Sequence, residues 1–294
     1  MDQIIGILEQ GMIYAVMALG VYITYRILDF PDLTVDGSFP LGAAVTAVLI
    51  EGGANPVLSL LAATGAGALA GLCTGLIHVK CKVRDLLAGI IMMTALYSVN
   101  LHIAGKANLP IFGSATLFKT AQGGFTLPGA LSPYTVVILS TAIAVLAKLL
   151  LDWYLTTRSG MLLRAAGDND LVVTSLARHS GHVKVLGLVI ANALVALSGG
   201  VLCQQQRFFE ITMGTGTMVM GLAIVIIGTN LFRHVRFVKP TTAVLLGSVL
   251  YKACVSIALS LGLNPVDKNL MTALLFLAIL VLSGLKKKKV KRDA

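Results

Sequence analysis

The chain has 294 residues, of which 56% are hydrophobic and only 12% charged, and its formal net charge is +10. Soluble domains are about 45–50% apolar and about 25% charged, so this composition excludes an ordinary soluble enzyme, a disordered chain and a fibrous protein. Apolar runs of about 20 residues, enough to cross a hydrocarbon core of about 30 Å, recur along the chain. The sequence therefore predicts an all-α, polytopic integral membrane protein.

The apolar runs predict about nine membrane-spanning helices within one transmembrane domain that covers 1–294. Turn-forming residues separate them, such as Gly52 and Gly53, Pro240, and the Asn264-Pro265 pair. In chain order the expected spans are 4–25, 36–50, 57–79, 85–104, 133–155, 184–204, 216–232, 240–261 and 268–285.

The connectors between these spans are alternately rich and poor in basic residues. The connectors rich in Lys and Arg are 80–84, 158–184, 233–239 and the tail 286–294, whereas the intervening connectors contain few. Alternation of this kind is typical of the positive-inside rule, and it predicts a multi-pass cell-membrane protein with a cytoplasmic C-terminus. The net charge thus marks one side of the membrane and does not indicate nucleic acid binding.

A weak internal repeat relates the two halves of the chain. Aligned without a gap, 17–39 and 195–217 pair Ala18 with Ala196 and Phe30 with Phe208. In the expected topology the two copies run in opposite directions. This predicts inverted repeats with halves at about 5–104 and 184–285, an arrangement typical of transporters.

A polar segment interrupts each repeat. Residues 29–40 cannot form a regular helix throughout, because Pro31 and Pro40 each lack a backbone donor, and 210–217 is rich in Gly and Thr. Non-helical backbone at membrane depth is tolerated where it is buried in protein or lines a watery cavity. We predict that both segments border a translocation pathway, through Asp32, Thr34, Asp36, Ser38, Thr212, Gly214, Thr215, Gly216 and Thr217.

An alternative interpretation makes both segments ordinary interfacial loops that cap the helices after them. In this interpretation Asp36 and Ser38 are N-cap residues of the helix that follows.

The expected cytoplasmic loop 156–184 predicts a compact protruding knob. A short helix over 161–166 turns at Gly167, and Asp168 or Asn169 caps a second helix. Apolar Leu162, Leu171 and Leu176 could anchor a partner protein inside a basic rim. A long loop with interfacial helices is the alternative.

The run Arg-Ser-Gly-Met-Leu-Leu-Arg-Ala-Ala-Gly-Asp-Asn at 158–169 resembles the coupling loop of the permease family of branched-chain amino acid and ribose importers. Members of that family are membrane subunits of ATP-binding cassette importers, and 186–200 and 221–228 resemble their next spans. The resemblance implies that this loop sits in a groove of a separate ATPase. The residues implied are Arg158, Gly160, Leu163, Arg164, Ala165, Gly167, Asp168, Asn169 and Gly181.

The same resemblance implies the partners and the substrate. It implies a type II importer architecture, a second copy of the permease and an extracytoplasmic substrate-binding protein. The chain itself is then a transport subunit with no cofactor, and ATP and Mg²⁺ belong to the ATPase. The run 28–38 resembles a branch of amino acid importers, some linked to aromatic amino acids, so we expect an aromatic or branched-chain amino acid as substrate.

An ion-driven secondary transporter of small polar solutes is the alternative function. It requires paired carboxylates inside the membrane, and Asp29, Asp32 and Asp36 are the candidates. No metal site is expected, because His179 and His182 have helical spacing but lack a third ligand nearby in sequence.

Two features of the spans bear on packing and on substrate contact. Gly67, Gly71 and Gly75 recur every fourth residue and predict a smooth face for close helix packing. Lys252 lies midway along the span 240–261, where a buried cation is expensive, and it is either a satisfied structural pair or a substrate contact.

Overall fold

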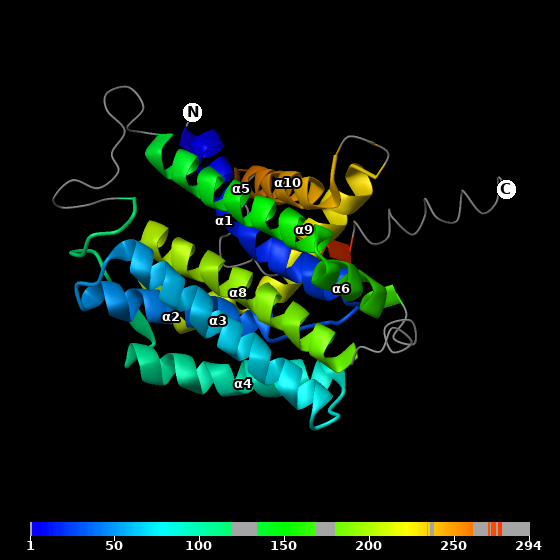
Figure 1. The fold of residues 1–294 in the computed structure, drawn as a ribbon. Coiled ribbons are helices and arrows are strands. Elements are labelled where there is room, and N and C mark those ends of the chain that lie inside the picture. Colours follow the sequence, from blue (N-terminus) through cyan, green and yellow to red (C-terminus); the bar gives the residue numbers. More distant parts are fainter. Residues whose placement is uncertain are drawn as a thin grey trace.

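The protein is described by a computed structural model, which covers 2–118, 134–168, 180–233, 235, 238–260, 270, 272–274, 276 and 277. This part of the chain is almost entirely helical (Figure 1). Its helices are α1 (Asp2–Val21), the π-helix η1 (Tyr22–Ile27), α2 (Val35–Glu51), α3 (Pro56–Val79), α4 (Asp85–Ala104), α5 (Thr135–Thr156), α6 (Arg158–Asp168), α8 (Ser180–Gln206), the 3₁₀-helix η3 (Ile211–Gly214), α9 (Thr217–Leu231) and α10 (Pro240–Ser260). Two short strands, β1 (Asn108–Pro110) and β2 (Phe208–Glu210), pair antiparallel.

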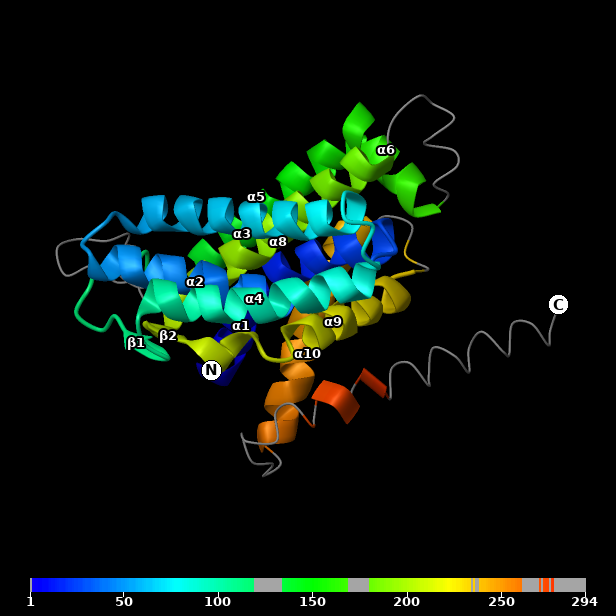
Figure 2. The ribbon, with the colours of Figure 1, turned by 90° about the horizontal axis from the view of Figure 1, so that it is seen from below.

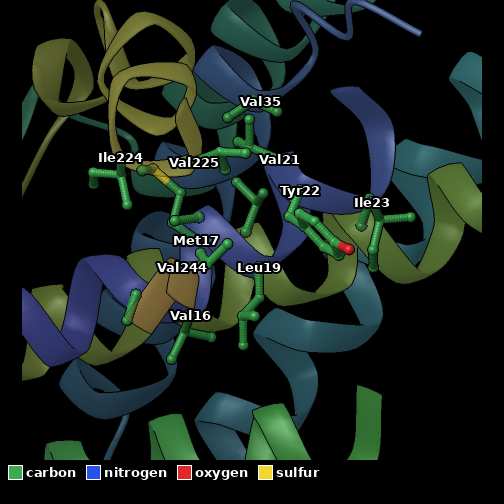
Figure 3. Packing of buried hydrophobic residues seen from close by; sticks show 14 of the residues in the cluster. Val16, Met17, Leu19, Val21, Tyr22, Ile23, Val35, Ile224, Val225 and Val244 are labelled. Atoms are coloured by element: carbon green, nitrogen blue, oxygen red, sulfur yellow. The ribbon is translucent and has the colours of Figure 1, made fainter. Parts of the chain in front are cut away.

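Helices α1 and α8 form the centre of the bundle (Figure 1). Helices α2, α3 and α4 pack on one side of this centre, and α5 and α10 pack on the other. The largest apolar cluster surrounds α1, where residues such as Met17, Leu19 and Val21 meet Ile224 of α9 and Val244 of α10 (Figure 3). Burial of apolar side chains thus joins α1 to helices that are distant from it in sequence.

Seven stretches of the described chain are long and apolar enough to cross a membrane. They are Gln3–Ile27, Pro56–Val79, Asp85–Ala104, Thr135–Thr156, Gly181–Gln206, Ile211–Leu231 and Pro240–Ser260. The prediction of a helical, multi-pass membrane protein is confirmed.

The predicted count of nine spans and the inverted repeat are not confirmed. The expected span 36–50 is the helix α2, but α2 has only 17 residues, because the polar segment before it is not helical. Most of the expected span 268–285, and with it much of the second repeat, lies outside the described residues.

Glycines bring α3 and α8 into direct backbone contact, as the four-residue spacing predicted. Gly67 lies against Asn192 and Ala196 of α8, and Gly71 lies against the carbonyl of Leu188. A Cβ atom at either glycine would overlap with these neighbours. The absence of side chains here is therefore what allows the two helices to approach so closely.

The two ends of the bundle differ in charge. At one end the 80–84 connector, α6 and the start of α8 meet, since Gly181 lies against the side chain of Val79 and Gly167 against the carbonyl of Ile27 (Figure 2). This end carries the basic residues Lys80, Lys82, Arg84, Arg158, Arg164, Lys184, Arg233 and Lys239. The paired strands β1 and β2 mark the opposite end (Figure 2). Three of the predicted basic connectors therefore share one end, while the tail 286–294 is outside the described residues.

Candidate functional site

The chain unwinds between α1 and α2, where the sequence predicted a non-helical segment. Helix α1 widens into η1, whose end is followed by a left-handed residue, Asp29, with φ of 51°. Regular helix resumes at Val35. Pro40 lies inside α2, and because it cannot donate to the carbonyl of Asp36, that carbonyl is left for other contacts.

A fully buried polar network fixes this unwound segment to α8 and α3. The Asp32 carboxylate accepts hydrogen bonds from the Thr34 backbone N–H (2.9 Å) and from Nδ2 of Asn192 (2.8 Å). Ser38 donates to Oδ1 of the same Asn192 at 2.7 Å, and the hydroxyls of Thr34 and Thr74 lie 3.0 Å apart. All five side chains are inaccessible to solvent, so the network satisfies polar groups that would otherwise be costly to bury.

A second carboxylate, that of Asp36 in the first turn of α2, caps a different helix. Asp36 accepts hydrogen bonds from the backbone N–H groups of Met218 (2.7 Å) and Gly216 (3.2 Å) and from the Thr217 hydroxyl (2.9 Å). The first N–H groups of a helix have no partner within it. A negative charge near them also interacts favourably with the positive end of the helix dipole. Gly216, which precedes α9 with φ of 79°, has no side chain to do this itself.

The interpretation of Asp36 and Ser38 as caps of their own helix is therefore wrong. At the start of α2 it is Asp32 that accepts from the Thr34 N–H, while the Asp36 side chain reaches α9 and Ser38 reaches Asn192 of α8. Both residues join helices that are distant in sequence.

The 210–217 segment contributes unevenly to this arrangement. Gly214 packs against the carbonyl of Asp36 and the ring of Pro40, and Thr217 is buried. Thr212 and Thr215 are exposed, and the Thr212 hydroxyl donates to Oε1 of Glu210 at 2.6 Å. The structure thus brings the two predicted polar segments together, and their role as the lining of a pathway remains a prediction.

Asn192, Thr74 and Asn100 are members of the site that sequence reasoning did not assign to it. Nδ2 of Asn100, on α4, donates to the carbonyl of Gly37 at 3.0 Å. The available signal was an isolated amide or hydroxyl within an apolar run, because such a group must find a partner when it is buried.

In the described part of the predicted coupling segment, one helix, α6, covers 158–168 and not only 161–166, and the second expected helix lies outside the described residues. Gly167 itself is helical, as the last residue but one of α6, and a Cβ there would overlap with the Ile27 carbonyl and press on the Leu28 Cα; the course of the chain after Asp168 lies outside the described residues. Leu163 is fully buried, and Gly187 of α8 lies against the side chains of both Leu163 and Leu28. Helix α6 is therefore seated on the residues that begin the unwound segment.

Of the remaining predicted coupling residues, some are packed against other helices and some are exposed on the surface. Gly160 is buried against Tyr154 and Leu155, which permits the tight turn from α5 into α6. Leu162 and Ala165 pack against the apolar core, so Leu162 is not a free anchor for a partner. Arg158, Met161 and Arg164 are exposed on α6. Asp168 is the last residue of the helix, and Asn169, Leu171 and Leu176 lie outside the described residues.

Lys252 is buried and has partners from α1. Its Nζ lies 3.8 Å from the centroid of the Tyr14 ring and donates to Oε1 of Gln10 at 3.3 Å. A cation over an aromatic face is stabilised by the quadrupole of the ring. These contacts support the interpretation of a structural pair.

A family profile described as the permease component of branched-chain amino acid transport systems matches residues 3–284. The chain belongs to this permease family. The tyrosine transport system permease protein of Clostridioides difficile is 42% identical over 285 residues, which are 97% of this chain and 92% of that protein. The ribose import permease protein RbsC of Escherichia coli K12 is 26% identical over 231 residues, 77% of this chain and 69% of the relative.

Membership of the permease family confirms the resemblance inferred from the coupling run. The galactofuranose transporter permease protein YtfT of Escherichia coli is a further relative, 23% identical over 95% of this chain and 79% of its own length. No solved structure matches the chain. Taken with the seven helical stretches among the described residues that are long and apolar enough to cross a membrane, the family makes this permease a multi-pass transport subunit for a small solute, in the ATP-binding cassette class.

Proposed function

We propose that this permease provides the alternating-access pathway of an ATP-binding cassette importer for an amino acid, with an aromatic side chain as the first candidate. The observation that carries the mechanism is the seat of α6 on η1. Gly167 contacts Ile27 and Leu28, and four residues later Asp32 begins the buried network.

A short chain of contacts connects α6 to the predicted pathway. Displacement of α6 acts on Ile27 and Leu28, which precede the unwound segment. Within that segment Asp32 is bonded to α8, and Asp36, four residues later in the first turn of α2, is bonded to the start of α9. Asp32 in the unwound segment and Asp36 in the first turn of α2 thus hold two other helices, so a shift of the segment and of the start of α2 is transmitted to both.

In this proposal an ATPase subunit docks on the exposed face of α6. Arg158 and Met161 are exposed one helical turn apart, and Met161 has 55% of its surface accessible. An exposed apolar side chain with basic neighbours suits a partner groove that has an apolar floor and an acidic rim. A second copy of the permease and an extracytoplasmic binding protein complete the proposed assembly.

The aromatic amino acid assignment rests on the tyrosine transport permease of Clostridioides difficile, which aligns over nearly the whole chain. The ribose and galactofuranose permeases are more distant in sequence. The polar run 28–38 gives further support, since it resembles importers of aromatic amino acids. A branched-chain amino acid is the second candidate.

The ion-driven alternative has less support. Asp32 accepts two hydrogen bonds, one of them from Asn192 of α8, Asp36 accepts three from the start of α9, and Asp29 is exposed. A coupling site for Na⁺ or H⁺ needs carboxylates that face one another or a cavity. Among the residues that the structure describes, no group of three His, Cys, Asp or Glu side chains could hold a metal ion.

Co-purification tests the proposed docking face. The chain is co-expressed with its cognate cassette ATPase and purified through a tag on the permease, as wild type, as Met161→Asp, and as Ala107→Asp, which places the same charge on an exposed site at the opposite end. We expect the ATPase to be lost with Met161→Asp and retained with Ala107→Asp. Retention with both variants, or ion-driven uptake by the chain alone in liposomes, would contradict the proposal.

Uptake by the reconstituted assembly tests the substrate. Proteoliposomes that contain the permease and ATPase, with the binding protein added outside, are supplied with labelled tyrosine or leucine. We expect ATP-dependent uptake of tyrosine to exceed that of leucine; the reverse order would assign the transporter to branched-chain amino acids.

A further inference from the structure

A cavity of about 450 Å³ opens at the basic end of the bundle, between η1, α6, α9 and α10. Its polar lining consists of Tyr22, Arg26, Arg164, Thr229 and Arg233. Apolar residues, among them Phe232 and Pro240, form the rest of the wall. The volume falls within the range of about 300–1,000 Å³ that is typical of small-ligand sites.

The cavity concentrates positive charge. Arg26 of η1, Arg164 of α6 and Arg233 after α9 line it and are exposed, and the described lining residues include no carboxylate. In the described part of the chain none of the three guanidinium groups forms an ion pair or a hydrogen bond with a carboxylate. Unpaired guanidinium groups that converge on one space repel one another, and an anion between them removes that repulsion.

Asp152 of α5, an acidic residue that precedes the turn into α6, is already engaged. Its carboxylate lies 3.0 Å from Nζ of Lys148 and 3.5 Å from Nζ of Lys239, and it accepts a 2.6 Å hydrogen bond from the Thr241 hydroxyl. Among the described residues that line the cavity, the three arginines are therefore the charged groups, and all are positive.

The cavity lies at the ends of helical stretches that are long and apolar enough to cross a membrane. Arg26 is next to the last residue of the first span, Thr229 is in the last turn of α9, and Pro240 is the first residue of α10. Exposed aromatic residues, Tyr25 and Trp153, lie near the same ends of their helices. Tyrosine and tryptophan are enriched at the level of the lipid headgroups.

We propose that this cavity binds the phosphate-bearing headgroup of an anionic phospholipid. The guanidinium groups of Arg26, Arg164 and Arg233 bind the phosphate, because their planar donors match its oxygens. The hydroxyls of Tyr22 and Thr229 are further donors, and the apolar wall contacts the glycerol and the first acyl carbons. Basic pockets between membrane helices are a known type of lipid site. The proposal goes beyond the transport function and does not depend on it.

Lipid titration of the purified full chain tests the proposal. The detergent-solubilised protein is titrated with short-chain phosphatidylglycerol, short-chain phosphatidylcholine and inorganic phosphate, and binding is followed by native mass spectrometry and by thermal unfolding. The variants are Arg26→Gln with Arg233→Gln, the single Arg233→Gln, and Arg84→Gln, which removes an arginine from a second basic cavity at the same end.

We expect wild type to bind phosphatidylglycerol and to discriminate against phosphatidylcholine. The double variant should bind phosphatidylglycerol at least about tenfold more weakly, and Arg84→Gln should bind as wild type does. The single Arg233→Gln, at an exposed position after α9, gives a smaller loss and keeps the test valid if the double variant does not fold.

Three outcomes overturn the proposal. Equal losses in Arg84→Gln and the double variant would show that general surface charge, and not this cavity, attracts the lipid. Wild-type affinity in Arg233→Gln and in the double variant would exclude the arginines. Saturation by inorganic phosphate as tight as by phosphatidylglycerol would show that the cavity takes a free anion and not a lipid.

Discussion

The carboxylate of Asp36 accepts a 2.7 Å hydrogen bond from the backbone N–H of Met218, 182 positions further along the chain. This bond ties the second helix of the permease to the first turn of α9. Asp36 is only partly exposed, and its other oxygen accepts from Gly216. The start of α9 is thus completed by a side chain from another helix.

Removal of this cap should destabilise the permease. Asp36→Ala leaves the N–H groups of Gly216 and Met218 without an acceptor and should lower the free energy of unfolding by about 1–2 kcal/mol. Asp36→Asn keeps one acceptor oxygen and should cost less. Thermal unfolding of the detergent-purified variants measures the order; equal stability of wild type and Asp36→Ala would show that the bond contributes nothing.

Removal of the Asn192 amide should destabilise the permease more than removal of one small side chain ordinarily does. Asn192→Ala deprives both Asp32 and Ser38 of a partner in a region without solvent access, and each orphaned group costs about 1–3 kcal/mol. A matched control is Leu186→Ala, at a partly exposed position on the same helix. We expect a large drop in unfolding temperature for Asn192→Ala and a small one for the control, and similar drops would contradict the role of the network.

The contact between α3 and α8 predicts opposite effects for two glycines of one helix. At Gly71 a Cβ would overlap with the Leu188 carbonyl, whereas at Gly65 a Cβ meets nothing within 4 Å. Gly71→Ala should therefore destabilise the protein. Gly65→Ala should be neutral or should stabilise it by up to about 1 kcal/mol, because alanine favours helix. Unfolding temperatures of the two variants decide, and a stable Gly71→Ala variant would mean that the helices can separate at little cost.

Gly167→Ala should uncouple the transporter without preventing its insertion. The added Cβ would overlap with the Ile27 carbonyl and lift α6 from its seat. The control Gly6→Ala adds a methyl group where nothing lies within 4 Å. In the reconstituted assembly we expect substrate-stimulated ATP hydrolysis to fall about tenfold or more for Gly167→Ala and to stay normal for Gly6→Ala. Normal stimulation in both would remove α6 from the proposed coupling path.

The helices could be predicted from the sequence because long apolar runs bounded by Gly, Pro and basic residues leave few other choices. The ends of α5 and α9 differ from the predicted spans by two residues or fewer, and the glycines of α3 form the expected close contact. These helices form wherever a long apolar run occurs, and such runs can be recognised in the sequence alone.

The partners of the polar groups could not be predicted in the same way. Asp36 and Ser38 resemble ordinary N-cap residues, and only the arrangement of helices shows that they bond to α9 and α8. Gly167 resembles a turn residue for the same reason: its contact with Ile27 joins segments that are 140 positions apart (167 − 27). Such pairings depend on tertiary packing, and no local pattern in one sequence encodes them.

The π-helix η1 has a geometric consequence for α6. A π-helix closes its hydrogen bonds over one residue more than an α-helix does, and each residue of an α-helix turns the chain by about 100°. If α1 continued as regular α-helix through Tyr22–Ile27, the last residues would be rotated by roughly that angle, and the Ile27 carbonyl would no longer face Gly167. The extra residue per turn thus determines the direction, around the helix axis, in which Arg26 and Ile27 face. As a result, the end of the first span faces α6.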